Sequence, residues 1–236
     1  MQSVVSAIIV AAGSGVRMNA GRPKQYLTIA GRPVLNHTLQ KFLDCRQVDV
    51  IYLVVPKADF GYCRENILPP VDPGKPIRLI GGGAARQHSV CKGLAAVEEK
   101  NGLVIIHDGV RPLVQTSLIS DCILQAQETG ACIAGIPVYD TIKRAGDSGD
   151  IEETVERKGL WLAQTPQVFR YGLIRKAHDR AIVEGYTGTD DAILVERICN
   201  PVKIIPVSKT NIKITNREDL AMAASLLQQD VSAFQR

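Results

Sequence analysis

A short stretch near the N-terminus combines a bare turn with positive charge, and it offers the clearest chemistry in the chain. Residues Ile8–Leu27 read IIVAAGSGVRMNAGRPKQYL, so that Ala-Ala-Gly-Ser-Gly follows an apolar run and precedes Arg17 and Lys24. Backbone N–H groups in such a turn can converge on an anion, and a helix that follows adds the positive end of its dipole. Pro23 provides a rigid, extended approach to Lys24. The combination favours a polyphosphate ligand.

A purely structural turn is the alternative for this loop. The dinucleotide pattern G-x-G-x-x-G with a later acid is absent, as is the P-loop pattern G-x-x-x-x-G-K-[ST], and Gly13-x-Gly15 alone is a weak signal. The two cations that flank the turn favour phosphate binding over a plain bend.

Further cations and one acid occur later in the chain, most of them near turns that follow strands: Arg86, Asp108, Arg111, Arg157 and Lys213. Phosphoryl and nucleotidyl transfer depend mainly on positioning and charge neutralisation, which such residues supply. Nucleophilic and zinc chemistry find little support, because the chain lacks G-x-S-x-G, H-E-x-x-H and a cysteine cluster. His88 and His178 fall in expected helices, where packing or solvation is their expected role. Asp108 either holds Mg²⁺ or a water of its shell, or acts only as a turn residue or cap.

Strands and helices alternate along most of the chain. Apolar runs predict buried strands at 4–10, 48–55, 77–80, 103–106, 131–138, 202–207 and 211–215. Helical spacing and caps predict helices at 33–45, 58–68, 86–100, 116–129 and 169–184, a short one that ends at 198, and one from 216 onward, with caps at Thr116, 187–191 and Asn216. This order implies a Rossmann-like α/β fold: a mostly parallel, twisted sheet flanked by helices. Ligands bind beyond the carboxyl ends of such strands, where the turns at Gly13, Gly81 and Asp108 all fall.

One segment departs from this alternation of strands and helices. Residues 139–165 alternate apolar and polar side chains around Asp147-Ser148-Gly149, a hairpin signal, and we expect a protruding β-arm. Two strands alone are marginally stable in water, so the arm should pack on something. A partner subunit and the protein's own sheet are equally weighted alternatives on the residues alone.

The amino-acid composition restricts the class of protein that we expect. The 236 residues are 45% hydrophobic and 22% charged, which fits a single globular domain spanning 1–236. The net charge of +4 comes from interspersed residues, so neither a nucleic acid nor a membrane is expected as partner. Six cysteines without a C-x-x-C pair suggest free thiols in a reducing compartment, and the N-terminal apolar run is too short to span a bilayer. We therefore expect a cytoplasmic protein.

The motifs taken together resemble a known family. AAGSGVRM, PKQYL, GGGAARQHSV, HDGVRP, PVYDTIKR, GLWLAQTPQVF, TDDA and NIKIT occur in the order typical of 2-C-methyl-D-erythritol 4-phosphate cytidylyltransferases of the non-mevalonate isoprenoid pathway. The resemblance covers nearly the whole chain and implies a nucleotidyltransferase-type fold. It implies transfer of CMP from CTP to the acceptor phosphate, giving 4-diphosphocytidyl-2-C-methyl-D-erythritol and pyrophosphate. Mg²⁺ would be held mainly through the CTP phosphates, with no direct protein ligand assigned.

The resemblance also implies roles for individual residues. Arg17 and Lys24 would neutralise charge on the triphosphate, Lys213 would contact the phosphates, and Arg157 would act with them as a fourth catalytic residue. Thr141 and Arg157 would hold the acceptor phosphate from the neighbouring subunit's arm, which makes the arm a homodimer element. The remaining expected substrate-binding residues are Ala11, Ala12, Gly13, Gly83 and Ser89 around CTP, Arg86 as a brace of that loop, Asp108, Gly109 and Arg111 on the ribose and acceptor side, and Thr165 and Thr189.

Two departures and two alternatives accompany this interpretation. Ala84 stands where relatives often carry an acid, so base selectivity should depend more on backbone groups. Val10 stands where they often carry proline, and neither change removes a charge from the proposed chemistry. A ribitol 5-phosphate cytidylyltransferase is the nearest alternative, and the segments 10–13 and 159–161 favour the erythritol-phosphate enzyme. A nucleotide-binding module without turnover is the other alternative, against which the retained cations argue.

Overall fold

A seven-stranded sheet forms the centre of the computed structural model, which describes residues 3–13, 22–69, 71 and 74–233. The strand order is β11-β7-β10-β6-β1-β4-β5, and the pairing is parallel except where β10 runs antiparallel to β6 and β7. The mostly parallel α/β fold is thereby confirmed. The strands of this sheet are β1 (Val5–Val10), β4 (Val50–Val55), β5 (Ile77–Gly81), β6 (Leu103–Asp108), β7 (Ala131–Pro137), β10 (Trp161–Arg170) and β11 (Lys203–Pro206).

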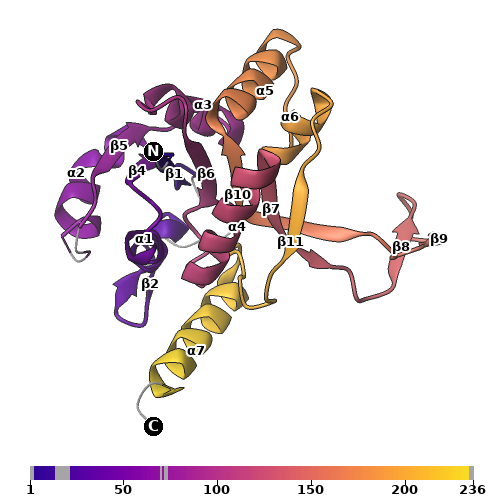
Figure 1. Cartoon of the computed structure of the whole chain (residues 1–236). Helices are drawn as coiled ribbons and strands as arrows, with labels where there is room; N and C mark the ends of the chain where they lie inside the picture. The colour runs from indigo at the N-terminus through magenta and orange to yellow at the C-terminus, as the bar shows by residue number, and fades with distance from the viewer. Residues whose placement is uncertain (1–2, 14–21, 70, 72–73, 234–236) are drawn as a thin grey trace.

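Helices cover both faces of this sheet because its inner strands are apolar on both sides (Figure 1). On one face, Ile9 and Ile105 pack with the apolar residues of α1 (Val34–Asp44) and α4 (Thr116–Thr129). On the other, Ile8 and Ile106 pack with α3 (Arg86–Ala96), α5 (Tyr171–Val183) and α6 (Ala192–Arg197). The shorter elements are η2 (Lys24–Tyr26), β2 (Thr28–Ile29), β3 (Arg32–Pro33), η3 (Lys57–Asp59), α2 (Phe60–Tyr62) and the π-helical turn η4 (Cys63–Ile67). No helix in the described ranges is long and apolar enough to cross a membrane.

The strand register brings the three unusual turns to one edge. Val10 pairs with both Val54 and Asp108, and Val55 pairs with Gly81, so β1, β4, β5 and β6 end side by side. Gly109 N–H then donates to the Val10 carbonyl at 2.8 Å, and Gly82 N–H to the Val55 carbonyl at 2.8 Å. The loops that follow these strands therefore share one rim, as the sequence predicts.

Several predicted boundaries were wrong. The helix expected at 86–100 ends at Ala96, because Val97 has an extended backbone conformation and its N–H donates to the Leu94 carbonyl. Thr116 is the first residue of α4 and not its cap. Phe169 belongs to β10, where its pairing with Val104 and Ala131 outweighs its helical spacing. Residues 211–215 form no strand, although Ile214 N–H donates to the Val110 carbonyl.

The predicted hairpin forms β8 (Ile142–Ala145) and β9 (Ile151–Val155), which pair only with each other among the described strands. It protrudes beyond the ends of β7 and β10, away from α2 and β5, and does not fold back over the sheet (Figure 1). The predicted range 139–165 needs one correction, because Trp161–Ala163 pair with β7 and so belong to the central sheet. The arm and its base leave Tyr139, Ile151 and Leu162 exposed.

The last helix, α7 (Arg217–Ala233), packs beside the rim. Asn216 accepts from Asp219 N–H at 2.8 Å, while the Asp219 carboxylate accepts from Asn216 N–H at 3.0 Å, so the expected cap is a reciprocal capping box. Ala223 and Ile214 share an apolar cluster with Val110, which follows the third turn. This cluster anchors the 208–215 connection against the rim.

Thr38 links a helix directly to the third turn. Its hydroxyl, fully buried on α1, donates to the Gly109 carbonyl at 2.9 Å. Thr38→Val keeps the side-chain shape but leaves that carbonyl unsatisfied, so we expect a loss of about 1–3 kcal/mol in unfolding free energy. Urea denaturation measures it, with Thr38→Ser as the control that retains the hydroxyl. A Val variant as stable as wild type would contradict this role.

Candidate active site

A cavity of about 400 Å³ opens at the rim where the strands end. Its wall comes from all three turns, from η2 and from the connection before α7. The described wall residues are Val10, Ala11, Ala12, Gly13, Lys24, Gln25, Gly83, Ala84, Ala85, Arg86, Ser89, Asp108, Val110 and Lys213. Backbone and small side chains thus form one part of the wall, and positive charges form another.

The first turn is tied to η2 by a buried amide. Gln25 Nε2 donates to the carbonyls of Ala11 at 2.9 Å and Gly13 at 3.1 Å, and its side chain is almost fully buried. The neighbouring residue Lys24 therefore reaches the cavity from a helical turn fixed to the loop it faces. We did not predict a role for Gln25, although its position inside the PKQYL motif was an available signal.

The second turn follows β5 and opens α3. Ser89 Oγ accepts from Gly83 N–H at 3.0 Å and donates to the Ala85 carbonyl at 3.1 Å, which holds the turn against the helix. A side chain at Gly83 would place Cβ 2.5 Å from Cβ of His88, so the close approach requires glycine. The turn consequently presents bare backbone at the N-terminal end of α3, a location suited to phosphate.

The third turn centres on Asp108. Its Oδ1 accepts from Arg86 Nε at 3.0 Å, its Oδ2 lies 2.7 Å from Lys213 Nζ, and Arg111 Nε lies 3.9 Å from Oδ2. Burial alone would raise the pKa of the Asp108 carboxyl, but the charges of Arg86 and Lys213 outweigh burial and hold that pKa below its usual range. Asp108 is therefore ionised, and it draws three cations to one point.

The donor set at this wall bears on Mg²⁺. Both Asp108 oxygens are engaged by cations, and the described residues contain no group of three or more His, Cys, Asp or Glu side chains able to hold a metal. Mg²⁺ prefers several oxygen ligands and often takes them from substrate phosphates and water. The described wall residues thus offer no carboxylate cluster of their own for Mg²⁺, and a metal carried by a nucleotide's phosphates stays a prediction.

The structure brings most predicted residues together but not all. Ala11, Ala12, Gly13, Lys24, Gly83, Arg86, Ser89, Asp108 and Lys213 line the cavity. Three others lie behind it: Gly109 packs against Ala11 and Leu35, Arg111 donates to the Asn211 carbonyl at 2.7 Å, and Thr165 Oγ1 accepts from Asp108 N–H at 3.2 Å. Direct substrate contact by these three stays a prediction.

The remaining predicted residues lie elsewhere. Thr189 is exposed in the loop before α6. Thr141 and Arg157 are exposed on the arm and its base, where Arg157 donates to the Tyr139 carbonyl. Arg17 falls within 14–21, outside the described residues.

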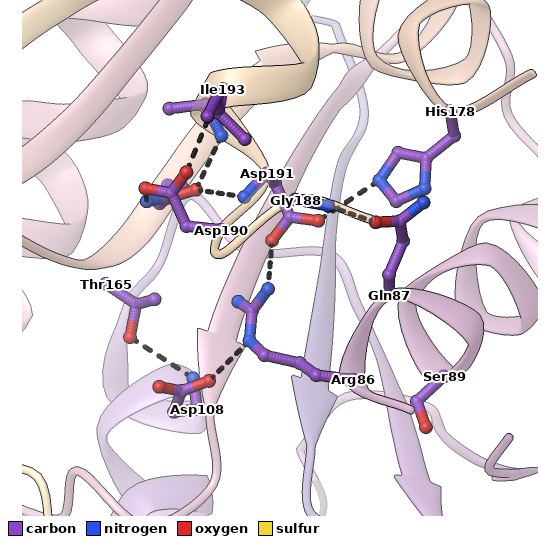
Figure 2. Close-up of polar contacts among 12 residues, drawn as sticks. Arg86, Gln87, Ser89, Asp108, Thr165, His178, Gly188, Asp190, Asp191 and Ile193 are labelled. Carbon is purple, nitrogen blue, oxygen red and sulfur yellow. Dashed lines mark hydrogen bonds and ion pairs between the residues drawn. The ribbon is translucent and has the colours of Figure 1, made fainter. Parts of the chain in front are cut away.

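A second layer of polar contacts lies behind Arg86 (Figure 2). Arg86 Nη1 donates to Asp191 Oδ2 at 2.7 Å, and Asp191 Oδ1 lies 3.1 Å from His178 Nε2. Gln87 joins the same region, since its Oε1 accepts from Gly188 N–H at 2.8 Å. His178 is packed, as expected of a helical histidine, yet its ion pair was not foreseen because the partners are far apart in the sequence.

Solved structures share this architecture. A 4-diphosphocytidyl-2C-methyl-D-erythritol synthase from Anaerococcus prevotii superposes with a TM-score of 0.85 at 34% identity, covering 96% of this chain and 97% of that one. A 2-C-methyl-D-erythritol 4-phosphate cytidylyltransferase from Thermus thermophilus gives a TM-score of 0.77 at 32% identity, covering 97% and 100%. Together with the cationic, glycine-lined cavity, they define the class of protein as a cytidylyltransferase.

Sequence relatives define the family. The family model of IspD, 2-C-methyl-D-erythritol 4-phosphate cytidylyltransferase, matches residues 5–229. A protein of that name from Syntrophus aciditrophicus is 46% identical over 230 residues, covering 98% of each chain. Another, from Syntrophotalea carbinolica, is 47% identical over 224 residues, covering 94% of this chain and 96% of that protein. The chain belongs to the 2-C-methyl-D-erythritol 4-phosphate cytidylyltransferase family.

Proposed function

We propose that the cavity binds CTP and that the enzyme transfers CMP from it to 2-C-methyl-D-erythritol 4-phosphate, releasing pyrophosphate, in isoprenoid biosynthesis. The observation that carries this proposal is the convergence of Lys24, Arg86 and Lys213 with two bare turns on one cavity at the strand ends. Such a wall suits a triphosphate, and the family membership supplies the acceptor.

The reaction needs positioned charge more than a side-chain nucleophile. A phosphate oxygen of the acceptor attacks the α-phosphorus in line, the new P–O bond forms, and the bond to the bridging oxygen breaks as pyrophosphate leaves with the electron pair. Negative charge grows on the α-phosphate and on the leaving group. Lys24, held at the rim by the Gln25 contacts, neutralises this charge, and we expect Arg17 to act with it.

Lys213 and Arg86 provide cations whose positions are set before substrate arrives. Each contacts an oxygen of Asp108, which fixes their charges at the wall. Lys213 is the more accessible, with 38% of its side chain exposed against 27% for Arg86, so it is the one suited to contact the phosphates. Mg²⁺, carried by the phosphates, supplies further charge neutralisation when bound.

The acceptor side requires a second copy of the chain in this proposal. Thr141 and Arg157 lie exposed on the protruding arm and its base, and neither is among the described wall residues. Exposed Tyr139, Ile151 and Leu162 give the same region an apolar surface suited to a subunit contact. A homodimer would place one arm over its partner's cavity and complete the site.

The compartment and the competing substrate complete the proposal. All six cysteines are free thiols, which suits the reducing cytoplasm. Ribitol 5-phosphate stays the alternative acceptor, although the curated relatives named above carry the erythritol-phosphate name.

Pyrophosphate release tests the function directly. With CTP and Mg²⁺, we expect release with 2-C-methyl-D-erythritol 4-phosphate and little with ribitol 5-phosphate or without acceptor. Preferred use of ribitol 5-phosphate would replace the proposed acceptor, and CTP binding without release under any condition would indicate a non-catalytic module.

Lys24→Ala should lower turnover far more than CTP affinity. Its charge is used chiefly in the transition state, so we expect kcat to fall roughly 10²-fold or more while the CTP Kd changes less than about 5-fold. Steady-state kinetics and calorimetry measure the two quantities. Lys100→Ala, which removes an exposed lysine after α3, serves as control. Equal losses in turnover and affinity would contradict the assigned role.

Arg157→Ala should raise the acceptor KM, and mixing with Lys24→Ala should restore activity in part. A mixed dimer contains one site with both residues intact, so random exchange should recover about a quarter of the wild-type activity. Activity of the mixture is compared with the sum of the separate variants. No recovery, with subunit exchange verified by mass spectrometry, would show that the arm acts within its own chain.

A further inference from the structure

A chain of polar contacts centred on the buried residues His178 and Asp191 runs from α3 and α5 to the cavity wall, and we call it the His178 relay. Its members, in order of contact, are Cys91, His178, Asp191, Arg86 and Asp108. Cys91 Sγ lies 3.1 Å from His178 Nδ1, and His178 Nε2 lies 3.1 Å from Asp191 Oδ1. Arg86 then bridges the two carboxylates, with Nη1 2.7 Å from Asp191 and Nε 3.0 Å from Asp108 (Figure 2). The relay therefore joins a helix remote from the substrate to a residue of the wall.

Asp191 is the middle link of the relay. Its side chain is 1% exposed, and its two oxygens have different partners, His178 on one side and Arg86 on the other. Its own N–H donates to Gln167 Oε1 at 3.1 Å, which fixes the backbone of the loop. A buried carboxylate has no water to replace a missing partner, so both oxygens depend on these contacts. Without His178, Oδ1 would lose this partner, and the orientation of the carboxylate would depend on Arg86 alone.

We propose that His178 is a positioning residue of the cytidylyltransferase site, because its Nε2–H orients Asp191 and Asp191 in turn fixes the guanidinium of Arg86 at the cavity wall. The kinetic tests of this inference rest on the proposed function, because they measure CMP transfer from CTP. Among the described residues, the polar contacts of His178 are with Cys91 and Asp191, and it reaches Arg86 through Asp191. Removing it should loosen Arg86 and weaken CTP binding while leaving Lys24 in place.

The charge state of His178 gives the relay a pH dependence. Cys91 and Arg86 approach from α3 and Asp191 from the loop before α6, while Arg175 on α5 acts on Cys91. Burial alone would lower the pKa of His178, but the hydrogen bonds to Asp191 and Cys91 outweigh burial and raise that pKa to about 9. The imidazolium is therefore present at neutral pH, with both N–H groups donating. Because the pKa is raised, the contribution of this charge is complete at low pH and is lost as pH rises through about 9.

Steady-state kinetics between pH 7 and 10 test the proposal on wild type, His178→Gln and the control Asp179→Asn. We expect the wild-type CTP KM to rise around pH 9. In His178→Gln, KM should be raised about tenfold at pH 7, within the usual range of site coupling, and the rise near pH 9 should be absent. Asp179→Asn, which removes an exposed charge next to His178, should follow wild type. A Gln variant that keeps the wild-type rise, or whose KM at pH 7 is within about 2-fold of wild type, would overturn the proposal.

A double-mutant cycle separates positioning from general loss of structure. Asp191→Asn should raise the CTP KM, and adding His178→Gln to it should raise KM little further, because both changes break the same link. Additive effects would overturn the relay. Melting temperatures of the variants show whether each one is folded. If His178→Gln does not fold, the Asp191→Asn variant and the pH profile of wild type test the relay instead.

Histidine ring signals in ¹H–¹⁵N NMR provide a readout that needs no turnover. The chain has four histidines, and comparison with His178→Gln assigns the signal of His178. We expect it to titrate near pH 9 in wild type and markedly lower in Asp191→Asn, whereas titration near the ordinary value in wild type would overturn the proposal. If wild type releases no pyrophosphate, the proposed function fails while this titration still tests the contact. If wild type is active and the titration is ordinary, the relay alone fails.

Discussion

The ionised carboxylate of Asp108 is the interaction on which the rest of the site depends. It is buried at the end of β6, and it is the shared partner of Arg86, Lys213 and Arg111. These cations come from three separate parts of the chain, and Asp108 is the anion that all three share. Without it their mutual repulsion would separate them, because unscreened like charges at such distances repel strongly. Asp108 therefore offsets the mutual repulsion of these cations in the folded protein, before the substrate's phosphates bind.

The sheet explains why Asp108 lies where it does. Pairing of Val10 with Asp108 and with Val54 brings the ends of three parallel strands to one rim, and Gly109 continues that pairing onto the Val10 carbonyl. A one-residue slip of β6 would turn its side chains to the opposite face. Ile105 and Ile106 pack in the clusters on opposite faces of the sheet, and a slip would also carry Asp108 away from its pairing with Val10 at the rim. The core thus sets the position of the charge.

Patterns among neighbouring residues predicted most strands and helices, but they missed contacts between residues that are distant in the sequence. The alternation of β-branched runs and helical spacing was sufficient for six of the seven strands of the sheet, for its rim and for the protruding hairpin, and it missed β10. The strand at Phe169 was missed because its partners, Val104 and Ala131, are supplied by other strands and leave no trace in nearby residues. Thr165 and Arg111 are among the predicted substrate contacts; the structure places both next to Asp108 and outside the described cavity wall, and their direct contact with substrate stays a prediction. The pairing of His178 with Asp191 spans 13 residues across a helix end and a loop, and no periodicity links them.

Stability alone does not account for the buried charges. Replacing a buried ion pair with apolar side chains of similar volume is often neutral or stabilising, whereas removing one partner is costly. Asp108 and Asp191 are both almost fully buried and both engage Arg86, so a chain selected only to fold would gain little from keeping them. A guanidinium that is hydrogen-bonded on two sides cannot rotate freely, so it loses less conformational entropy when a phosphate binds. The arrangement is therefore best explained as preorganisation of the cavity wall, with Asp108 fixing the near side of Arg86 and Asp191 the far side.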